Sequence, residues 1–285
     1  MNTHINFAFF GTDEFAVTVL NTLALKGLSP SLVVTTPDAP KGRHLTLTPP
    51  PVKDWAEERK IPILQPEKLK DEALKSELEN MNLDLFVVAS YGKIIPESIF
   101  NIPKYKTLNI HPSLLPKLRG ASPVSTAILE DLKDTGVTVM QIDAGMDHGP
   151  IVAQENYHVG EWLPKQELES TLATVGAMLL AKTIPGYING TIQPIPQDDT
   201  KASYTKMVEK KDAEIDLRDD PYLNFRKILA YAEWPKAFTF FETASHKIRA
   251  QITEATFENG ELLILKVIPE GKKEMDFEDF KRGLR

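Results

Sequence analysis

The most constraining feature of the sequence is an alternation, over the first 140 residues, of short apolar runs with amphipathic stretches. This order is typical of a parallel sheet covered by helices. We expect strands at Asn6–Phe10, Leu32–Thr35, Ile61–Leu64, Leu83–Ala89, Leu108–His111 and Val137–Asp143. The sequence therefore predicts an α/β fold built on a Rossmann-like, mostly parallel sheet.

The sequence changes character after residue 188. Residues 189–205 are rich in Pro, Gln, Asp and Thr, a composition that predicts a linker. A helical stretch at Leu223–Tyr231 and β-rich runs at Phe238–Phe241, Lys247–Ile252 and Glu261–Ile268 follow. We therefore expect a catalytic domain over residues 1–188, a linker over 189–205 and a small, β-rich, open-barrel (OB-like) domain over 206–285.

Composition narrows the classes of function. The absence of cysteine excludes disulfides, thiolate zinc sites and cysteine nucleophiles. No apolar run approaches the roughly 20 residues that a membrane span needs, and Met1–Phe10 lacks the basic start of a signal peptide. A net charge of −7 disfavours a dedicated DNA-binding protein. We expect a cytoplasmic protein that binds neither membrane nor DNA.

Two polar residues mark the end of a predicted strand. Asn109 and His111 are two positions apart, so their side chains point the same way at the carboxyl end of that strand. Open α/β sheets place their ligand sites at this end. An asparagine amide and a protonated histidine can both donate hydrogen bonds to an oxyanion that develops during acyl transfer. This pair therefore indicates a candidate catalytic site.

A glycine-rich turn, Asp143–Pro150, follows the next predicted strand. If the two strands are adjacent, Asp147 lies near His111, and a carboxylate beside an imidazole favours the charged imidazole. An amide, an imidazolium and a carboxylate would then surround one point without a metal. Two alternatives stay open: Asn109 bonds only neighbouring backbone beside an ordinary strand-end His111, or His148 belongs to a metal site.

These residues resemble a known superfamily. The pattern Asn109-x-His111, Ser113-Leu114-Leu115-Pro116, Arg119-Gly120 and Asp147 is similar to that of the 10-formyltetrahydrofolate-dependent formyltransferases. Further segments are similar to the methionyl-tRNA formyltransferases within it: Phe9–Ala16, Thr36–Asp38, Lys41–Arg43, Pro50–Lys53, Tyr91–Pro96, Ala213–Asp216, Trp234–Pro235 and Pro269–Met275. The resemblance thus extends beyond the predicted linker.

The resemblance implies an activity and a set of site residues. It implies that Asn109, His111 and Asp147 transfer a formyl group from 10-formyltetrahydrofolate to initiator methionyl-tRNA for translation initiation, without a metal. The implied folate contacts are Ser113, Leu114, Leu115, Pro116, Tyr91 and Gly92. The implied tRNA contacts are Lys41 and Arg43, since phosphate contact needs only charge and reach. We expect the enzyme to be a monomer.

The second domain departs from the family pattern. Met207 stands where a lysine is common, Leu217 replaces a usual tryptophan, and the region after Ala255 is short. These departures concern tRNA binding and leave the catalytic residues untouched. A sugar-nucleotide N-formyltransferase using the same folate donor is the alternative enzyme. A catalytically silent folate- or RNA-binding module is the alternative from a different class.

Overall fold

A computed structural model describes residues 5–42, 45–243 and 246–284 of the chain. The chain forms two compact units. The first comprises Met1–Arg119, Gly136–Tyr157 and Glu169–Tyr204, and the second comprises Gly120–Thr135, His158–Leu168 and Thr205–Arg285. The second unit therefore adds two internal segments to the C-terminal region. This grouping differs from the expected division at residues 188 and 206, which stays a prediction.

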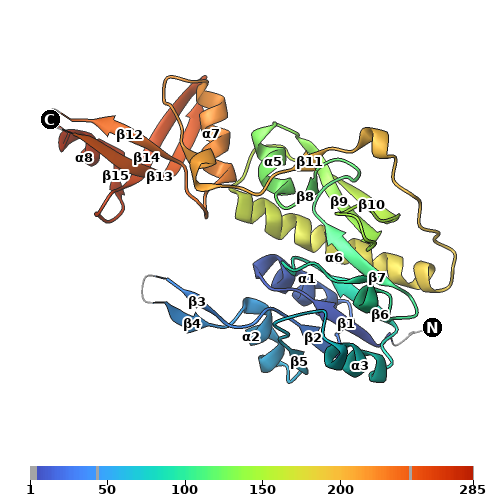
Figure 1. Cartoon of the computed structure of the whole chain (residues 1–285). Helices are drawn as coiled ribbons and strands as arrows, with labels where there is room; N and C mark the ends of the chain where they lie inside the picture. Colours follow the sequence, from blue (N-terminus) through green and yellow to red (C-terminus); the bar gives the residue numbers. More distant parts are fainter. Residues whose placement is uncertain (1–4, 43–44, 244–245, 285) are drawn as a thin grey trace. The chain divides into compact units, whose positions relative to one another are not determined.

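A seven-stranded sheet in the order β10-β9-β7-β6-β1-β2-β5 forms the centre of the first unit (Figure 1). Its strands are β1 (Phe7–Phe10), β2 (Leu32–Val34), β5 (Ile63–Leu64), β6 (Leu85–Val88), β7 (Thr107–His111), β9 (Asp134–Gln141) and β10 (Ile151–His158). The five strands from β5 to β7 are parallel, whereas β9 pairs with β7 in the antiparallel sense. The predicted α/β class with a mostly parallel sheet is confirmed.

Helices α3 (Glu72–Asn80) and α4 (Glu97–Phe100) cover one face of this sheet. Alternate side chains of β1, β2 and β6 form a buried core with them: Ala8, Phe10, Leu32, Val34, Phe86 and Val88. Val88 pairs with Asn109 on the neighbouring strand, so Asn109 projects from this same face. Alternation along β7 places His111 on this face as well, at the carboxyl end of the strand.

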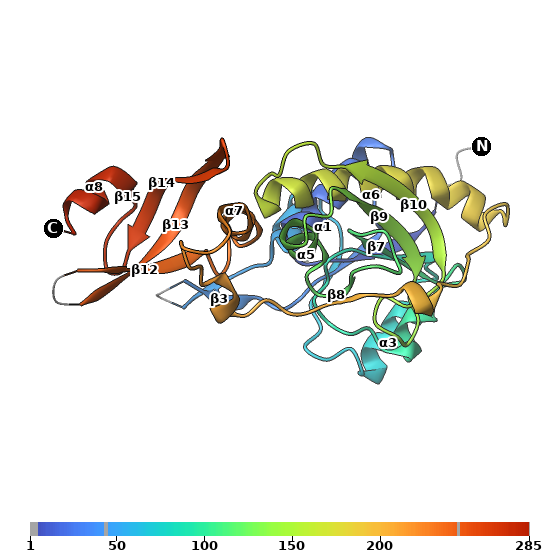
Figure 2. The same cartoon turned by 90° about the horizontal axis from the view of Figure 1, so that it is seen from above.

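Helix α6 (Lys165–Ile188) packs on the opposite face and runs along β9 and β10 (Figure 2). Gly176 allows a close approach, since a Cβ atom there would lie 2.5 Å from the Ile110 side chain and 2.8 Å from that of Val137. Among the described residues, α6 alone is long and apolar enough to cross a membrane. Packing against β7 and β9 gives its apolar surface a place in the core.

The segments after β1 and β2 begin two further helices. Helix α1 (Glu14–Leu25) is capped by Asp13, whose carboxylate accepts from the Ala16 amide at 3.2 Å. Between β2 and α2 (Pro51–Glu58) the chain forms a hairpin of β3 (Ala39–Lys41) and β4 (Thr46–Thr48), which is separate from the central sheet.

The second unit contains an antiparallel sheet in the order β12-β13-β14-β15, built on a small apolar core that includes Ile228, Val267 and Phe280. The remaining elements are α5 (Pro123–Leu129), α7 (Pro221–Ala230), α8 (Phe277–Arg282), β8 (Arg119–Gly120), β11 (Tyr204–Thr205), β12 (Phe238–Glu242), β13 (Lys247–Glu258), β14 (Glu261–Pro269), β15 (Met275–Asp276) and the 3₁₀ helices Asp199–Lys201 and Lys210–Ala213. The β-rich character predicted for the C-terminal region is confirmed.

Candidate active site

His111 ends strand β7 and is 5% exposed. Its Nε2 atom lies 3.0 Å from the main-chain carbonyl oxygen of Leu118. A carbonyl oxygen can only accept a hydrogen bond, so Nε2 carries a proton and donates it to Leu118. This contact fixes the orientation of the ring. The Nδ1 atom is therefore the ring nitrogen that faces the candidate site.

Asp147 lies in the loop between β9 and β10 and approaches His111 from that loop. Its Oδ2 atom is 3.6 Å from His111 Nδ1, so the predicted pair is brought together. At this separation the contact is an ion pair rather than a hydrogen bond, and a proton on Nδ1 can still be donated to a third atom. The backbone of Asp147 has a φ of 47°, a left-handed conformation that few non-glycine residues adopt.

Asn109 is half-buried on the same face of β7, two positions before His111. Its side-chain amide bonds no other residue in the described part of the chain. This observation disfavours the alternative in which Asn109 only satisfies neighbouring backbone. Asn109 therefore carries an amide donor on the face of β7 that also carries His111.

The implied folate contacts after β7 build a tight turn. The Ser113 hydroxyl is buried and donates to the Lys117 carbonyl at 2.7 Å. The Leu115 amide donates to the Thr138 hydroxyl at 3.1 Å, and the Leu115–Pro116 peptide bond is cis. Leu114 is half-buried in the same turn. These contacts hold the turn that presents the Leu118 carbonyl to His111, while folate binding by Ser113–Pro116 stays a prediction.

Tyr91 lies in the hydrophobic core. It is 2% exposed, and its ring meets that of Phe10 edge-on at 5.5 Å. Burial raises the pKa of the Tyr91 hydroxyl to about 12, and this hydroxyl has no hydrogen-bond partner among the described residues. The main-chain carbonyl of Tyr91 accepts from Thr12 at 2.7 Å, and Gly92 follows with a φ of 79°. Tyr91 therefore supports its loop from the core, and a folate contact at Tyr91 and Gly92 stays a prediction.

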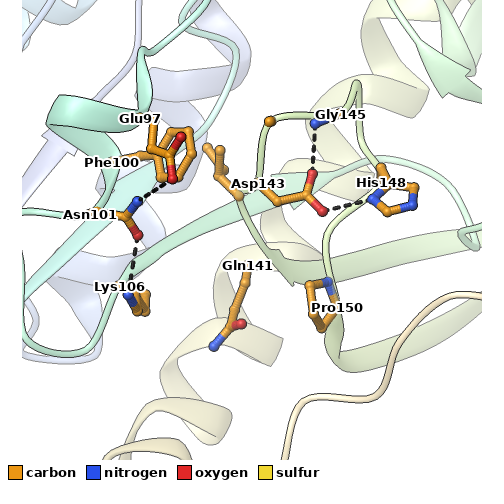
Figure 3. Close-up of a pocket in the computed structure, with 11 residues that line it drawn as sticks. Glu97, Phe100, Asn101, Lys106, Gln141, Asp143, Gly145, His148 and Pro150 are labelled. Atoms are coloured by element: carbon orange, nitrogen blue, oxygen red, sulfur yellow. Dashed lines mark hydrogen bonds and ion pairs between the residues drawn. The ribbon is translucent and has the colours of Figure 1, made fainter.

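A cavity of about 690 Å³ lies between the α4 region and the loop after β9. Figure 3 shows residues of the two segments facing each other across it. The cavity is lined by Glu97, Phe100, Asn101, Lys106, Gln141, Ile142, Asp143, Ala144, Gly145, His148 and Pro150. None of the residues implied for folate lines it. In the sequence, the glycine-rich turn indicates one wall of the cavity, but residues 97–106 contain no motif that indicates the other wall.

His148 follows Asp147 in the chain and bonds different partners. Its Nδ1 atom lies 2.7 Å from Asp143 and its Nε2 atom 3.4 Å from Asp199 (Figure 3 shows the Asp143 contact). The hydrogen bond to Asp143 is the main reason that the pKa of His148 is raised above its ordinary value. A hydrogen bond from Arg119 lowers the pKa of Asp199. The described residues contain no cluster of three or more potential metal ligands, so the metal alternative has no ligand set there.

The implied tRNA contacts are Lys41 and Arg43. Lys41 is the last residue of β3. Arg43 lies outside the described residues. A role for this pair in tRNA binding therefore stays a prediction.

Comparisons with known proteins extend the geometric findings. A family model described as formyl transferase matches residues 4–184. The methionyl-tRNA formyltransferase of Halalkalibacterium halodurans is 38% identical to this chain over 296 aligned residues. The alignment covers 96% of this chain and 93% of that protein. The similarity thus includes both the region of the candidate site and the C-terminal region.

Solved structures share the fold. The methionyl-tRNA formyltransferase from Clostridium thermocellum has a TM-score of 0.63 at 16% identity, over 95% of this chain and 99% of that one. An N-formyltransferase from Helicobacter canadensis, in complex with folinic acid and dTDP-3-aminofucose, has a TM-score of 0.65 at 19% identity. That match covers 90% of this chain and 88% of the other. At such low identity the two likenesses concern the fold.

Proposed function

The chain belongs to the formyl transferase family, and from that premise we propose that it transfers the formyl group of 10-formyltetrahydrofolate to the amino group of methionyl-tRNA. The observation that carries the choice of acceptor is the 38% identity to a methionyl-tRNA formyltransferase over 96% of this chain. The sugar-nucleotide alternative has weaker support, because the N-formyltransferase with a sugar nucleotide bound is 19% identical. The product, N-formylmethionyl-tRNA, serves translation initiation.

We assign the chemistry to Asn109, His111 and Asp147. The neutral amine attacks the formyl carbon, a carbon–nitrogen bond forms, and the formyl oxygen becomes an oxyanion. The Asn109 amide and the Nδ1 proton of charged His111 donate to this oxygen. When the intermediate collapses, the bond from the formyl carbon to N10 of the folate breaks. The attacking nitrogen releases one proton and N10 takes one up, so atoms and charge balance.

Asp147 supports this reaction through its charge. Its carboxylate stands 3.6 Å from His111 Nδ1, the ring nitrogen that we assign to the oxyanion. The carboxylate also lies close enough to take part in removing the proton from the attacking amine. Because Leu118 already binds Nε2, the ring cannot turn away from Asp147 without losing that hydrogen bond.

We place part of the folate donor in the cavity beside this site; the contacts with Ser113–Pro116, Tyr91 and Gly92 that the resemblance implies lie outside this cavity. Its volume of about 690 Å³ lies within the range of roughly 300–1,000 Å³ that is usual for small-molecule sites. The side chains of Phe100 and Ile142 supply apolar surface, whereas Glu97 and Asn101 supply polar atoms for a pteridine ring. The loop that forms one wall of the cavity also carries Asp147.

The acceptor stem is assigned to Lys41 and Arg43. Because the chain carries a net charge of −7, a local basic contact is needed to hold a polyanion. Arg43→Ala is expected to raise the KM for methionyl-tRNA and leave the KM for the folate unchanged. Higher salt is expected to weaken the binding of tRNA. An equal rise in both KM values, or binding that ignores salt, would contradict this assignment.

The deciding experiment is a formyl-transfer assay with 10-formyltetrahydrofolate and either methionyl-tRNA or a panel of amino-sugar nucleotides. We expect transfer to methionyl-tRNA alone. Asn109→Ala serves as the control for chemistry and is expected to lose about 10²- to 10³-fold in kcat, the usual effect of removing one oxyanion donor. Transfer to a sugar alone would replace the acceptor. Folate binding without any transfer would indicate a silent binding module.

A further inference from the structure

Arg119 is a buried charge that belongs to no catalytic assignment above. It is 1% exposed and lies directly after Leu118, whose carbonyl binds His111. Its guanidinium donates to the Gln197 side-chain oxygen at 3.0 and 2.8 Å, to Asp199 at 2.8 Å and to the Tyr204 hydroxyl at 3.2 Å. A buried guanidinium requires such partners, because an unpaired buried charge is costly. All three partners come from residues 189–204, which we call the connecting segment.

Gln197 joins this arginine to the loop that carries Asp147. Its side-chain nitrogen donates to the main-chain carbonyls of Asp147 at 2.9 Å and Gly149 at 2.8 Å. A guanidinium can only donate and a carbonyl can only accept, so the amide group of Gln197 has one possible orientation here. The tie acts on a strained residue, since Asp147 holds a φ of 47° and needs fixed surroundings to keep it.

The connecting segment also fixes the opposite side of the site. The Ser203 hydroxyl accepts from the Leu118 amide at 2.9 Å, and the Ser203 carbonyl accepts from the Arg119 amide at 2.9 Å. These bonds hold the backbone whose carbonyl receives the His111 proton. One stretch of chain therefore sets both members of the His111–Asp147 pair, through Ser203 on one side and Gln197 on the other.

We propose that Gln197 is a positioning residue for formyl transfer, which ties the Asp147 backbone to buried Arg119 so that the carboxylate faces His111. This inference rests on the proposed function and assigns a role in the reaction to a residue that follows the catalytic loop by about 50 positions. It gives the connecting segment a part in catalysis, whereas its composition alone predicted a linker.

Gln197→Glu tests the tie with little change in shape. The new carboxylate still accepts from Arg119, but its second oxygen faces two carbonyls that also can only accept. We expect kcat to fall about 10²-fold, the scale of a roughly 1 Å misplacement, with the KM for methionyl-tRNA unchanged. Gln193→Glu is the matched control, because Gln193 is exposed in the same segment and donates to the Gly190 carbonyl at 2.7 Å. It is expected to keep the kcat of the wild type.

A double variant separates positioning from general damage. If Gln197 acts through Asp147, Gln197→Glu adds little loss when Asp147→Asn is already present. A full 10²-fold further loss in that background would overturn the proposal, as would a wild-type kcat for the single variant. The thermal unfolding midpoint of each variant shows that it is folded.

Hydrogen–deuterium exchange gives a readout that does not require activity. Amides of residues 142–149 are expected to exchange faster in Gln197→Glu than in the wild type and in Gln193→Glu, because local opening becomes easier when the loop loses its ties. Unchanged exchange would show that Gln197 does not hold the loop. A wild-type protein that transfers no formyl group would overturn the proposed function, and the exchange experiment would still decide whether Gln197 holds the loop.

Discussion

Two histidine–aspartate pairs use the loop between β9 and β10, and their surroundings differ. His111 is 5% exposed and stands 3.6 Å from Asp147. The His148 side chain is 47% exposed and stands 2.7 Å from Asp143. Asp147 and His148 are neighbours in the sequence, yet each contacts a partner in a different pair. The loop thus holds one buried pair with a long contact and one exposed pair with a short contact.

The difference supports the proposal that the His111–Asp147 pair takes part in the reaction and that the His148–Asp143 pair holds the loop. His148 has a carboxylate at each nitrogen, Asp143 at 2.7 Å and Asp199 at 3.4 Å, so both of its donors are engaged. His111 has a carbonyl at Nε2 and a carboxylate at Nδ1 beyond hydrogen-bond distance. The second arrangement leaves a donor that can serve a substrate oxygen. We therefore assign chemistry to His111 and loop anchoring to His148.

The largest expected effect comes from deleting the two imidazoles in turn. His111→Ala is expected to lower kcat by about 10³-fold, the upper end of the roughly 10²- to 10³-fold loss that is usual when one oxyanion donor is removed. Binding of tetrahydrofolate should persist, since His111 acts on the transition state and does not line the cavity. Steady-state kinetics and equilibrium titration with tetrahydrofolate measure the two quantities.

His148→Ala is the matched deletion in the exposed pair. It is expected to lower kcat less than about tenfold, because it removes an anchor of the loop and no donor to the oxyanion. Equal losses in the two variants would break the distinction between the pairs. Loss of tetrahydrofolate binding in His111→Ala would move His111 from the reaction to the binding site.

The same substitution, aspartate to asparagine, can be made in each of the two pairs, and its effects are expected to be smaller than those of deleting the imidazoles. Asp147→Asn removes the charge that faces His111 and is expected to lower kcat by about 10²-fold. Asp143→Asn retains an oxygen that can accept from the Gly145 amide, which the aspartate now binds at 2.9 Å. Its kcat is expected to stay within about threefold of the wild type, since exposed ion pairs contribute little. Single-turnover rates at saturating folate distinguish the two.

Of the two histidine–aspartate pairs, the sequence predicts His111–Asp147 better than His148–Asp143. The register of β7 places Asn109 and His111 on one face through strict alternation, and adjacency of β7 and β9 brings Asp147 to them. The positions of the strands could also be predicted from the sequence, because buried parallel strands appear there as short apolar runs. Local patterns of this kind require only neighbours along the chain.

The contacts that hold the site in place could not be predicted from such patterns. Gln197 and Asp199 meet Arg119 across 78 and 80 positions, and no spacing rule relates a residue in a proline-rich segment to a buried arginine. The same holds for the cavity, whose α4 wall has no motif, and for Tyr91, whose ring lies in the core although its segment resembles a folate-binding loop. Such contacts depend on how the connecting segment folds back on the sheet.

The smallest expected effect concerns stability, and it depends on the exposed pair. Asp143 raises the pKa of His148 above its ordinary value, with a smaller contribution from Asp199. A raised pKa in the folded state means that folding favours protonated His148. This stabilisation is fully present below the ordinary pKa of about 6.5 and is lost as pH rises through the higher folded value. Because His148 is half-exposed, we expect this effect to stabilise the folded protein by less than about 1 kcal/mol.

Urea unfolding of the wild type and of His148→Asn, each at about pH 6 and at about pH 8.5, measures this contribution on either side of the ordinary histidine pKa. The wild type is expected to lose more of its unfolding free energy between the two values than the variant does. The difference between the wild type and the variant reports the imidazole that faces Asp143 and Asp199. Identical losses in both proteins would show that His148 gains nothing from its two carboxylates, and the loop would then depend on Gln197 for its anchoring.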